Sequence, residues 1–203
     1  MTWDVLTIIG TVAFAISGAI VAMEEEYDIL GVYILGIVTA FGGGAIRNLF
    51  IGVPVSALWE QGMLFQIALL SITAVFLFPN NLLKHWNRWG NFFDAIGLSA
   101  FAIQGALYAS DMNHPMSAII VAAVLTGSGG GMIRDLLAGR KPLILRAEEI
   151  YAVWAIICGI AIGLDIVSSP VELYILFVLA TSLRVLSYIY KWRLPNRSLK
   201  ARA

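Results

Sequence analysis

The most distinctive residues of this sequence are two runs of three glycines, each followed three residues later by an arginine. Gly42, Gly43 and Gly44 precede Arg47, and Gly129–Gly131 precede Arg134. Glycine costs about 1 kcal/mol relative to alanine in a helix interior. Each run therefore predicts a kink or a break in its helix, and the carbonyls freed by a break can coordinate a monovalent cation.

Both kinds of residue also allow a structural interpretation. Small residues let membrane helices pack closely, and arginines near a helix end can extend to the membrane interface. Within a pore, Arg47 and Arg134 would act as gates or local barriers, because a charge inside a span usually faces a polar interior or a partner.

Further polar residues surround the glycine runs. Asp135 follows Arg134 and is expected to pair with an arginine of a neighbouring helix, whereas Asp94 is expected at a helix start, where the helix dipole stabilises it. As a symmetric set around the glycines, the hydroxyl and amide residues are candidates for the lining of a pore. They are Ser17, Thr39, Gln104, Thr126 and Ser128.

Composition identifies the elements that must position these residues. The chain has 203 residues, of which 60% are hydrophobic and 13% charged, whereas soluble domains carry about 25% charged residues. The formal net charge is zero, so no global field attracts nucleic acid. Cys158 is the only cysteine, which excludes an intrachain disulfide, and no residue cluster indicates a metal or cofactor. The sequence predicts an all-α integral membrane protein.

Seven stretches are long and apolar enough to cross a bilayer, which takes about 20 residues. Short loops with proline or asparagine separate them. The predicted spans are Val5–Ala22, Ile29–Phe50, Gln61–Phe78, Asn91–Ala109, Ser117–Ala138, Glu149–Ile166 and Val171–Tyr190.

Basic residues predict the orientation of these spans. With seven spans, all ten Lys and Arg residues outside them fall on the side of the C-terminus, so the C-terminus is expected in the cytoplasm and the N-terminus outside. We therefore expect a multi-pass protein of the plasma (inner) membrane, with the basic tail near anionic lipid. The ten residues are Lys84, Arg88, Arg140, Lys141, Arg146, Lys191, Arg193, Arg197, Lys200 and Arg202.

The sequence contains an internal repeat at an offset of 87 residues. Positions 4–52 and 91–139 share 17 identities in 49 without a gap, including both glycine runs and both arginines. Each copy holds three spans, an odd number, so the second copy is expected to be inverted in the membrane. We expect a first repeat over 1–82, an inverted second repeat over 83–168, and a seventh helix with a basic tail over 169–203. Inverted repeats are typical of transport proteins.

The paired elements GGGAIRN and GGGMIRD, in a layout of three, three and one helices, resemble the prokaryotic members of the trimeric intracellular cation channel family. The same sequences are also grouped under a glycine transporter domain name. The resemblance implies a homotrimer whose protomers each contain a pore, lined by kinked second and fifth helices and permeable to potassium and other monovalent cations. It places Gly42–Gly44, Arg47, Gly129–Gly131, Arg134 and Asp135 in that pore.

Two other functions remain open on the residues alone. A carrier for glycine or a similar solute could use Arg47 or Arg134 to bind a carboxylate. A scaffold without conduction is disfavoured, because duplicated helix breaks would serve no purpose in a passive bundle. An enzyme is not expected, since the spans show no HExxH motif, no Ser/His pairing and no two carboxylates at a common depth.

Overall fold

The computed structural model describes residues 2–78, 86–146 and 150–195, and these fold into helices and connecting loops without a β-strand. Two short 3-10 helices, η1 and η2, precede α3 and α7. The elements are α1 (Thr2–Glu24), α2 (Ile29–Phe50), η1 (Val55–Glu60), α3 (Gly62–Leu77), α5 (Trp86–Asp111), α6 (Met116–Leu137), η2 (Leu143–Leu145), α7 (Ala152–Gly163) and α8 (Pro170–Ile189).

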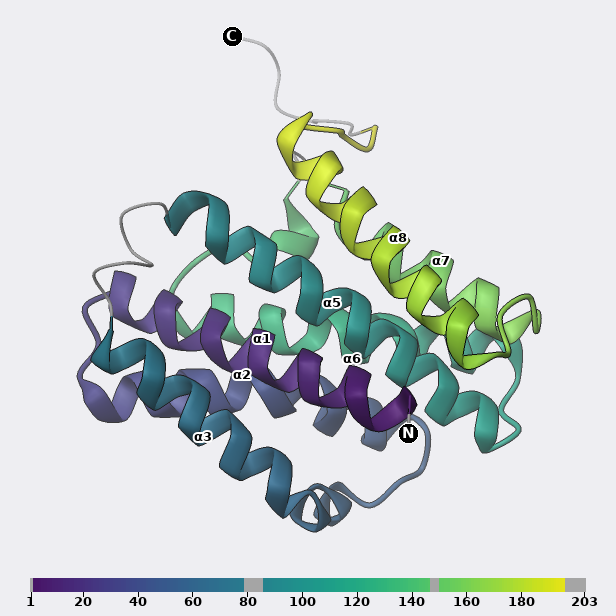
Figure 1. Cartoon of the computed structure of the whole chain (residues 1–203), viewed down its shortest axis with the longest axis horizontal. Helices are drawn as coiled ribbons and strands as arrows, with labels where there is room; N and C mark the ends of the chain where they lie inside the picture. The colour runs from purple at the N-terminus through teal and green to yellow at the C-terminus, as the bar shows by residue number, and fades with distance from the viewer. Residues whose placement is uncertain (1, 79–85, 147–149, 196–203) are drawn as a thin grey trace, which may run out of the picture.

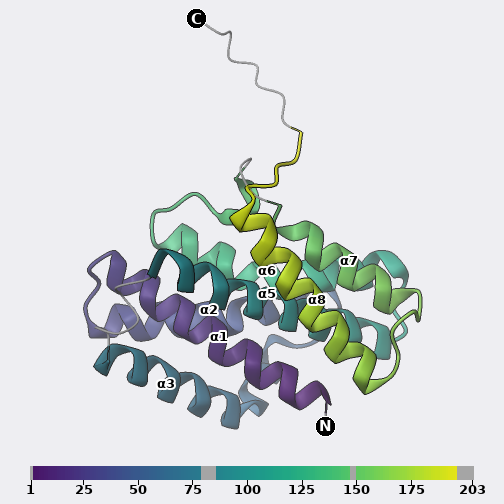
Figure 2. The same ribbon diagram turned by 45° about the horizontal axis from the view of Figure 1, so that its top comes forward.

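Helices α1 and α5 form the centre of the bundle. They pack against each other, α2 packs against α1 and α6, and α6 packs against α5. Buried residues make up 72% of the apolar stretch of α1 and 67% of that of α5, but 22% of that of α8. In Figures 1 and 2, α3 lies beside α1 on one side of the bundle, and α7 and α8 lie together on the other. The exposed faces are rich in leucine, isoleucine and valine, as lipid contact requires.

Local sequence signals explain where the helices begin and end. Asp28 caps α2 by accepting a hydrogen bond from the Gly31 amide. Ser169 and Glu172 form a capping box at the start of α8. Gly52 and Gly139 follow α2 and α6 with φ angles of 75° and 68°, the left-handed conformation that terminates many helices and suits glycine.

Five helices match predicted spans in length and composition: α1, α2, α5, α6 and α8. The other two apolar helices are shorter than their predicted spans. α3 has 16 residues and α7 has 12, and at 1.5 Å per residue 12 residues reach about 18 Å, short of a core of about 30 Å. Residues 150–151 before α7 and 164–166 after it are not helical. Glu149, the predicted start of that span, lies outside the described residues, as does the boundary at 82–83.

Contacts around the centre recur at the offset of 87 residues. A Cβ atom on Gly10 would meet the Phe101 ring at 2.8 Å, and one on Gly97 would collide with the Phe14 ring. The two rings themselves meet edge to face, with centroids 5.3 Å apart. The same reciprocity links α1 to α2 and α5 to α6. Gly18 lies against Thr39, and Gly105 lies against Thr126.

Helices α2 and α6 run through their glycine runs as uninterrupted α-helices, so the expected break with freed carbonyls is wrong. The middle glycines instead let the two backbones touch. A Cβ on Gly43 would lie 2.5 Å from the Thr126 carbonyl oxygen, and one on Gly130 would collide with the Thr39 carbonyl oxygen. Gly43 of α2 contacts Thr126 of α6, and Thr39 of α2 contacts Gly130 of α6, so the two helices cross antiparallel. Close packing, the alternative interpretation of the glycines, describes this crossing.

Candidate functional site: two arginine clusters beside the glycine crossing

Each arginine lies one helical turn beyond its middle glycine, and because α2 and α6 are antiparallel the two lie on opposite sides of the crossing. The Arg134 cluster consists of Arg134, Asp135, Asp94, Ser17 and Tyr151. The Arg47 cluster consists of Arg47, Asn48, Tyr108, Gln104 and Thr7. The first is built around an ion-paired arginine, and the second around an arginine with neutral neighbours.

In the Arg134 cluster, the guanidinium bridges three helices. Arg134 Nη1 donates to Ser17 Oγ of α1 at 2.6 Å and to Asp94 Oδ1 of α5 at 3.0 Å. Its Nε donates to Asp135 Oδ1 at 2.8 Å, and Nη2 lies 2.7 Å from the same oxygen. All four residues are at most 3% exposed. Charge-assisted hydrogen bonds of this kind are roughly twice as strong as neutral ones.

A second layer of contacts holds the two carboxylates in place. Asp135 Oδ2 accepts from the Leu143 amide of η2 at 3.0 Å. Tyr151 donates its hydroxyl to Asp94 Oδ1 at 3.1 Å, and Arg184 of α8 lies over the Tyr151 ring, 4.8 Å from guanidinium carbon to centroid. A chain of contacts therefore connects α8 with α5, α6 and α1.

A polar cavity of about 280 Å³ adjoins the Arg134 cluster. With one arginine and two carboxylates, the cluster has a formal charge of −1. Asp94 Oδ2 is buried without a hydrogen-bond partner among the described residues. The cavity has room for several waters or a hydrated ion. Its lining comprises Ser17, Val21, Glu24, Gly90, Asn91, Asp94, Arg134, Asp135, Arg140, Leu143, Arg146 and Tyr188.

Ion pairs lie beside this cavity, since Glu24 and Arg140 are among its lining residues. Arg140 Nη1 donates to Glu24 Oε2 at 2.8 Å and Arg140 Nε to Glu25 Oε1 at 2.6 Å. Partial burial lowers the pKa of Arg140, but its hydrogen bonds to the two carboxylates and their negative charge outweigh burial and raise that pKa. Tyr27 adds a hydrogen bond to the Leu137 carbonyl at 2.8 Å. The α1–α2 loop is thereby tied to the end of α6.

The Arg47 cluster lacks a carboxylate. Arg47 is 3% exposed, and its Nη2 and Nε donate to the Asn48 side-chain oxygen at 2.8 and 3.2 Å. The guanidinium carbon lies 4.4 Å from the centroid of the Tyr108 ring, a cation–π contact. No ion pair involves Arg47 in the part of the chain that the structure describes. The formal charge of this cluster is +1.

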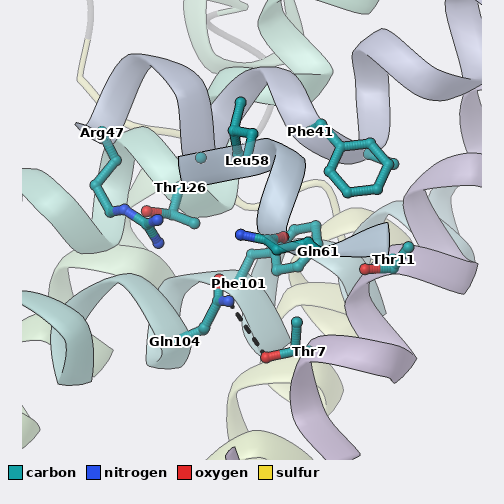
Figure 3. A pocket seen from close by; sticks show the side chains of 11 residues that line it. Thr7, Thr11, Phe41, Arg47, Leu58, Gln61, Phe101, Gln104 and Thr126 are labelled. Carbon is teal, nitrogen blue, oxygen red and sulfur yellow. Dashed lines mark hydrogen bonds between the residues drawn. The ribbon is translucent and has the colours of Figure 1, made fainter. Parts of the chain in front are cut away.

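The cavity beside Arg47 is far smaller, at about 20 Å³, which is room for about one water. Figure 3 shows the side chains of Arg47, Gln61 and Gln104 directed into it and the hydrogen bond from Gln104 to Thr7, 3.2 Å long. Its lining comprises Thr7, Thr11, Ala40, Phe41, Gly44, Arg47, Leu58, Gln61, Phe101, Gln104 and Thr126.

The structure divides the predicted site residues into three groups. Beside the small cavity lie Gly44, Arg47, Gln104 and Thr126. Beside the large cavity lie Ser17, Arg134 and Asp135, with Gly131 facing Tyr151 and Asp94. The third group takes part in helix packing and comprises Gly42, Gly43, Gly129, Gly130, Thr39 and Ser128. The hydroxyls of Thr39 and Ser128 donate to the backbone of their own helices, at the Leu35 and Val124 carbonyls.

Three expectations about charged residues are corrected. Asp94 lies two turns inside α5 and pairs with Arg134, so the helix dipole does not account for it. Asp135 pairs with the adjacent Arg134 of its own helix and not with a neighbouring helix. Asp94 and Asp135 also share one arginine, so two carboxylates do meet at a common depth.

Tyr151, Tyr108, Thr7 and Gln61 were not among the site residues predicted from the sequence. The repeat contained a signal for one of them, because Thr7 and Asp94 are separated by 87 residues. Nothing in the sequence distinguishes Tyr108 and Tyr151 from other interfacial aromatics.

Comparison with known proteins places the chain in a family. A family model described as glycine transporter matches residues 4–80 and 91–164. The UPF0126 membrane protein YvgT of Bacillus subtilis is 72% identical over 200 residues, 98% of each chain.

Solved structures are similar as well. A structure described as the basis for conductance through TRIC cation channels aligns with a TM-score of 0.83 at 37% identity, covering 99% of this chain and 100% of the other. The trimeric intracellular cation channel orthologue from Rhodobacter sphaeroides aligns with a TM-score of 0.83 at 34% identity, covering 94% and 98%. The chain belongs to the glycine transporter (UPF0126) family of membrane proteins and has the fold of the prokaryotic TRIC channels.

Proposed function

We propose that this protein is a channel for monovalent cations, permeable to potassium, with a pathway through each protomer between α2 and α6. The observation that carries the proposal is the pair of polar cavities on opposite sides of the glycine crossing. A polar cavity inside a membrane bundle needs a function, because burying polar groups there is costly. The likeness to structures described as TRIC cation channels supports the same activity.

The proposed pathway is closed at the crossing in this state. Between the cavities, the backbones of α2 and α6 touch at Gly43 and Gly130. On one side a cation meets the negative Arg134 cluster, which attracts it, and on the other it meets Arg47, which repels it. A separation or rotation of the two helices would join the cavities, and a contact between glycines permits such motion without displacing a side chain.

We further propose that α1–α3 and α5–α7 are inverted repeats and that α8 is a seventh span, with divisions at 82 and 168. The reciprocal contacts at the 87-residue offset support this arrangement. The positive-inside rule places the Arg134 cluster near the cytoplasm and the Arg47 cluster near the outside of the plasma (inner) membrane. Homotrimeric assembly is proposed from the relative described as trimeric.

A carrier for glycine is the second candidate, and the family description favours it. Arg47 could hold the carboxylate of glycine through its guanidinium. Against this function, the adjoining cavity of about 20 Å³ has room for about one water and not for an amino acid. The carrier would therefore need a larger opening on that side than the channel does.

Reconstitution in liposomes distinguishes the two functions. Under a potassium gradient, with labelled glycine outside, the channel is expected to give rapid electrogenic potassium flux without saturable glycine uptake. Saturable glycine uptake without independent potassium flux would establish the carrier and overturn the channel.

A matched pair of variants tests the pathway. Gly43→Leu places a side chain at the α2–α6 contact and is expected to abolish flux. Gly62→Leu is the control, since nothing lies within 4 Å of a Cβ atom there and Gly62 lines neither cavity. Far-UV circular dichroism and elution volume report whether each variant is folded. Normal flux through folded Gly43→Leu protein would exclude a pathway at this crossing.

A further inference from the structure

We propose that the Arg47 cavity binds one small monovalent anion of halide size. This inference deepens the proposed function and rests on it only for the consequence for conduction. The binding itself rests on the geometry of Arg47.

The first observation is a buried positive charge without a counter-charge. Arg47 is 3% exposed, and its Nε and Nη2 both donate to the neutral side chain of Asn48. Arg47 Nη1 has no hydrogen-bond partner in the described part of the chain. A buried charge is normally paired, because an unpaired one loses its hydration without compensation. An anion beside Nη1 would supply both the charge and the missing acceptor.

The second observation is the cavity beside the guanidinium. The side-chain amides of Gln61 and Gln104 and the Thr11 hydroxyl lie on its lining, and these groups are able to donate hydrogen bonds to an anion. None of the described residues that line the cavity is acidic. The volume of about 20 Å³ suits a single small ion. A zwitterion such as glycine requires more room and a carboxylate for its ammonium group.

The third observation is the equivalent arginine, which needs no external ion. At the offset of 87 residues, Asn48 corresponds to Asp135 and Thr7 to Asp94. Those two aspartates neutralise Arg134 directly. The chain thus supplies the counter-charge of Arg134 itself. In the Arg47 cluster, neutral residues occupy the two equivalent positions, so the counter-charge has to come from an anion in solution.

Anion binding would change how the pathway treats cations. With Arg47 uncompensated, a potassium ion entering on that side meets a net charge of +1. With a halide bound, the local charge falls to zero while the side chain stays in place. We expect potassium flux to depend on the anion present, although the anion itself does not cross.

The test of binding uses full-length protein in detergent micelles and bromide as the probe. Bromide replaces gluconate at constant potassium concentration, and the midpoint of thermal unfolding is followed. At about ten times its dissociation constant, bromide should raise the midpoint of wild type by about 3–6 °C. Asn48→Asp, which restores the carboxylate found at position 135, should lose this shift.

Several outcomes decide the matter. An equal shift in wild type and Asn48→Asp would indicate a bulk salt effect and overturn the site. The absence of a shift in wild type would also overturn the site. Thr7→Asp is the second variant, because it supplies the charge from α1 if Asn48→Asp does not fold, and it should also lose the shift. Stabilisation by glycine and not by bromide would overturn the halide assignment and favour the carrier.

Potassium flux in chloride and in gluconate separates this inference from the proposed function. Greater flux in chloride for wild type, with equal flux for Asn48→Asp, supports the role of the anion. A bromide shift in protein that conducts no potassium would support the anion site and overturn the channel. Potassium conduction without a bromide shift would support the channel and overturn the anion site.

Discussion

The Arg134 and Arg47 clusters derive from the same sequence pattern, yet they differ in charge. Arg134 contacts two carboxylates at 2.7–3.0 Å, whereas Arg47 contacts an asparagine and an aromatic ring. The adjoining cavities differ as well, at about 280 and 20 Å³. A duplicated framework therefore does not imply duplicated chemistry, because two substitutions at equivalent positions reverse the local charge.

The difference has consequences for a cation pathway. A cluster with one carboxylate in excess attracts cations, and a cluster built around an uncompensated arginine repels them. In the proposed pathway, a cation would therefore meet clusters of opposite charge on the two sides of the crossing.

The largest effect is expected from removing one partner of the buried ion pair. Asp94→Ala removes the buried acceptor that Arg134 and Tyr151 share, leaves both donors without it, and should destabilise the protein by about 3–5 kcal/mol. Thr7→Ala, the equivalent change in the other cluster, removes no charge and should cost about 1 kcal/mol, the usual value of one hydrogen bond. Thermal unfolding in micelles measures both. Equal losses would mean that the two clusters do not differ energetically.

A smaller effect is expected from the last glycine of each run. A Cβ on Gly131 would lie 3.0 Å from the Tyr151 hydroxyl and 3.4 Å from Asp94 Oδ1, so Gly131→Ala crowds the Arg134 cluster and should cost about 1–3 kcal/mol. Gly44→Ala meets only ordinary van der Waals contacts and should leave stability unchanged. Comparing the unfolding midpoints of the two variants checks this. A loss for Gly44→Ala as large as that for Gly131→Ala would contradict the asymmetry.

The smallest effect concerns the ion pairs of Arg140 beside the large cavity. Arg140→Gln should lower stability by about 0.2–1 kcal/mol, since such pairs are partly exposed, and the difference from wild type should shrink at high salt. The pKa of Arg140 is raised above its ordinary value. Its stabilising contribution is therefore complete below that ordinary value and is lost only as the pH rises through the raised pKa. The stability difference between wild type and Arg140→Gln should therefore stay constant between about pH 6 and 9, far below the ordinary pKa of arginine. A change of that difference within this range would exclude the charge of Arg140 as its source.

Much of the fold followed from local features of the sequence. Apolar length predicted α1, α2, α5, α6 and α8, and the loop breakers predicted where they end. The sixth predicted span was too long, because apolar residues continue past both ends of α7, at Ile150, Leu164 and Ile166, where the chain is not helical. Apolar composition predicts which residues are compatible with the membrane, but it does not predict where a helix begins and ends.

The residues around the site were predicted in part. The glycine runs and arginines were found by their repetition, and their helices were placed correctly. The expected helix break was wrong, because a run of glycines has the same sequence whether a helix breaks or another helix packs against it. Only the tertiary contact distinguishes the two, since a Cβ atom on Gly43 would lie 2.5 Å from the Thr126 carbonyl oxygen.

The sequence by itself determined that this is a helical membrane protein and that Arg47 and Arg134 are equivalent positions. The tertiary structure alone decided which groups neutralise each arginine. Asp94 is 40 residues from Arg134 in the chain, and Tyr151 and Arg184 join from other parts of the chain. Contacts between helices depend on their crossing and on the rotation of each about its axis, and neither is encoded within the helix that carries the arginine.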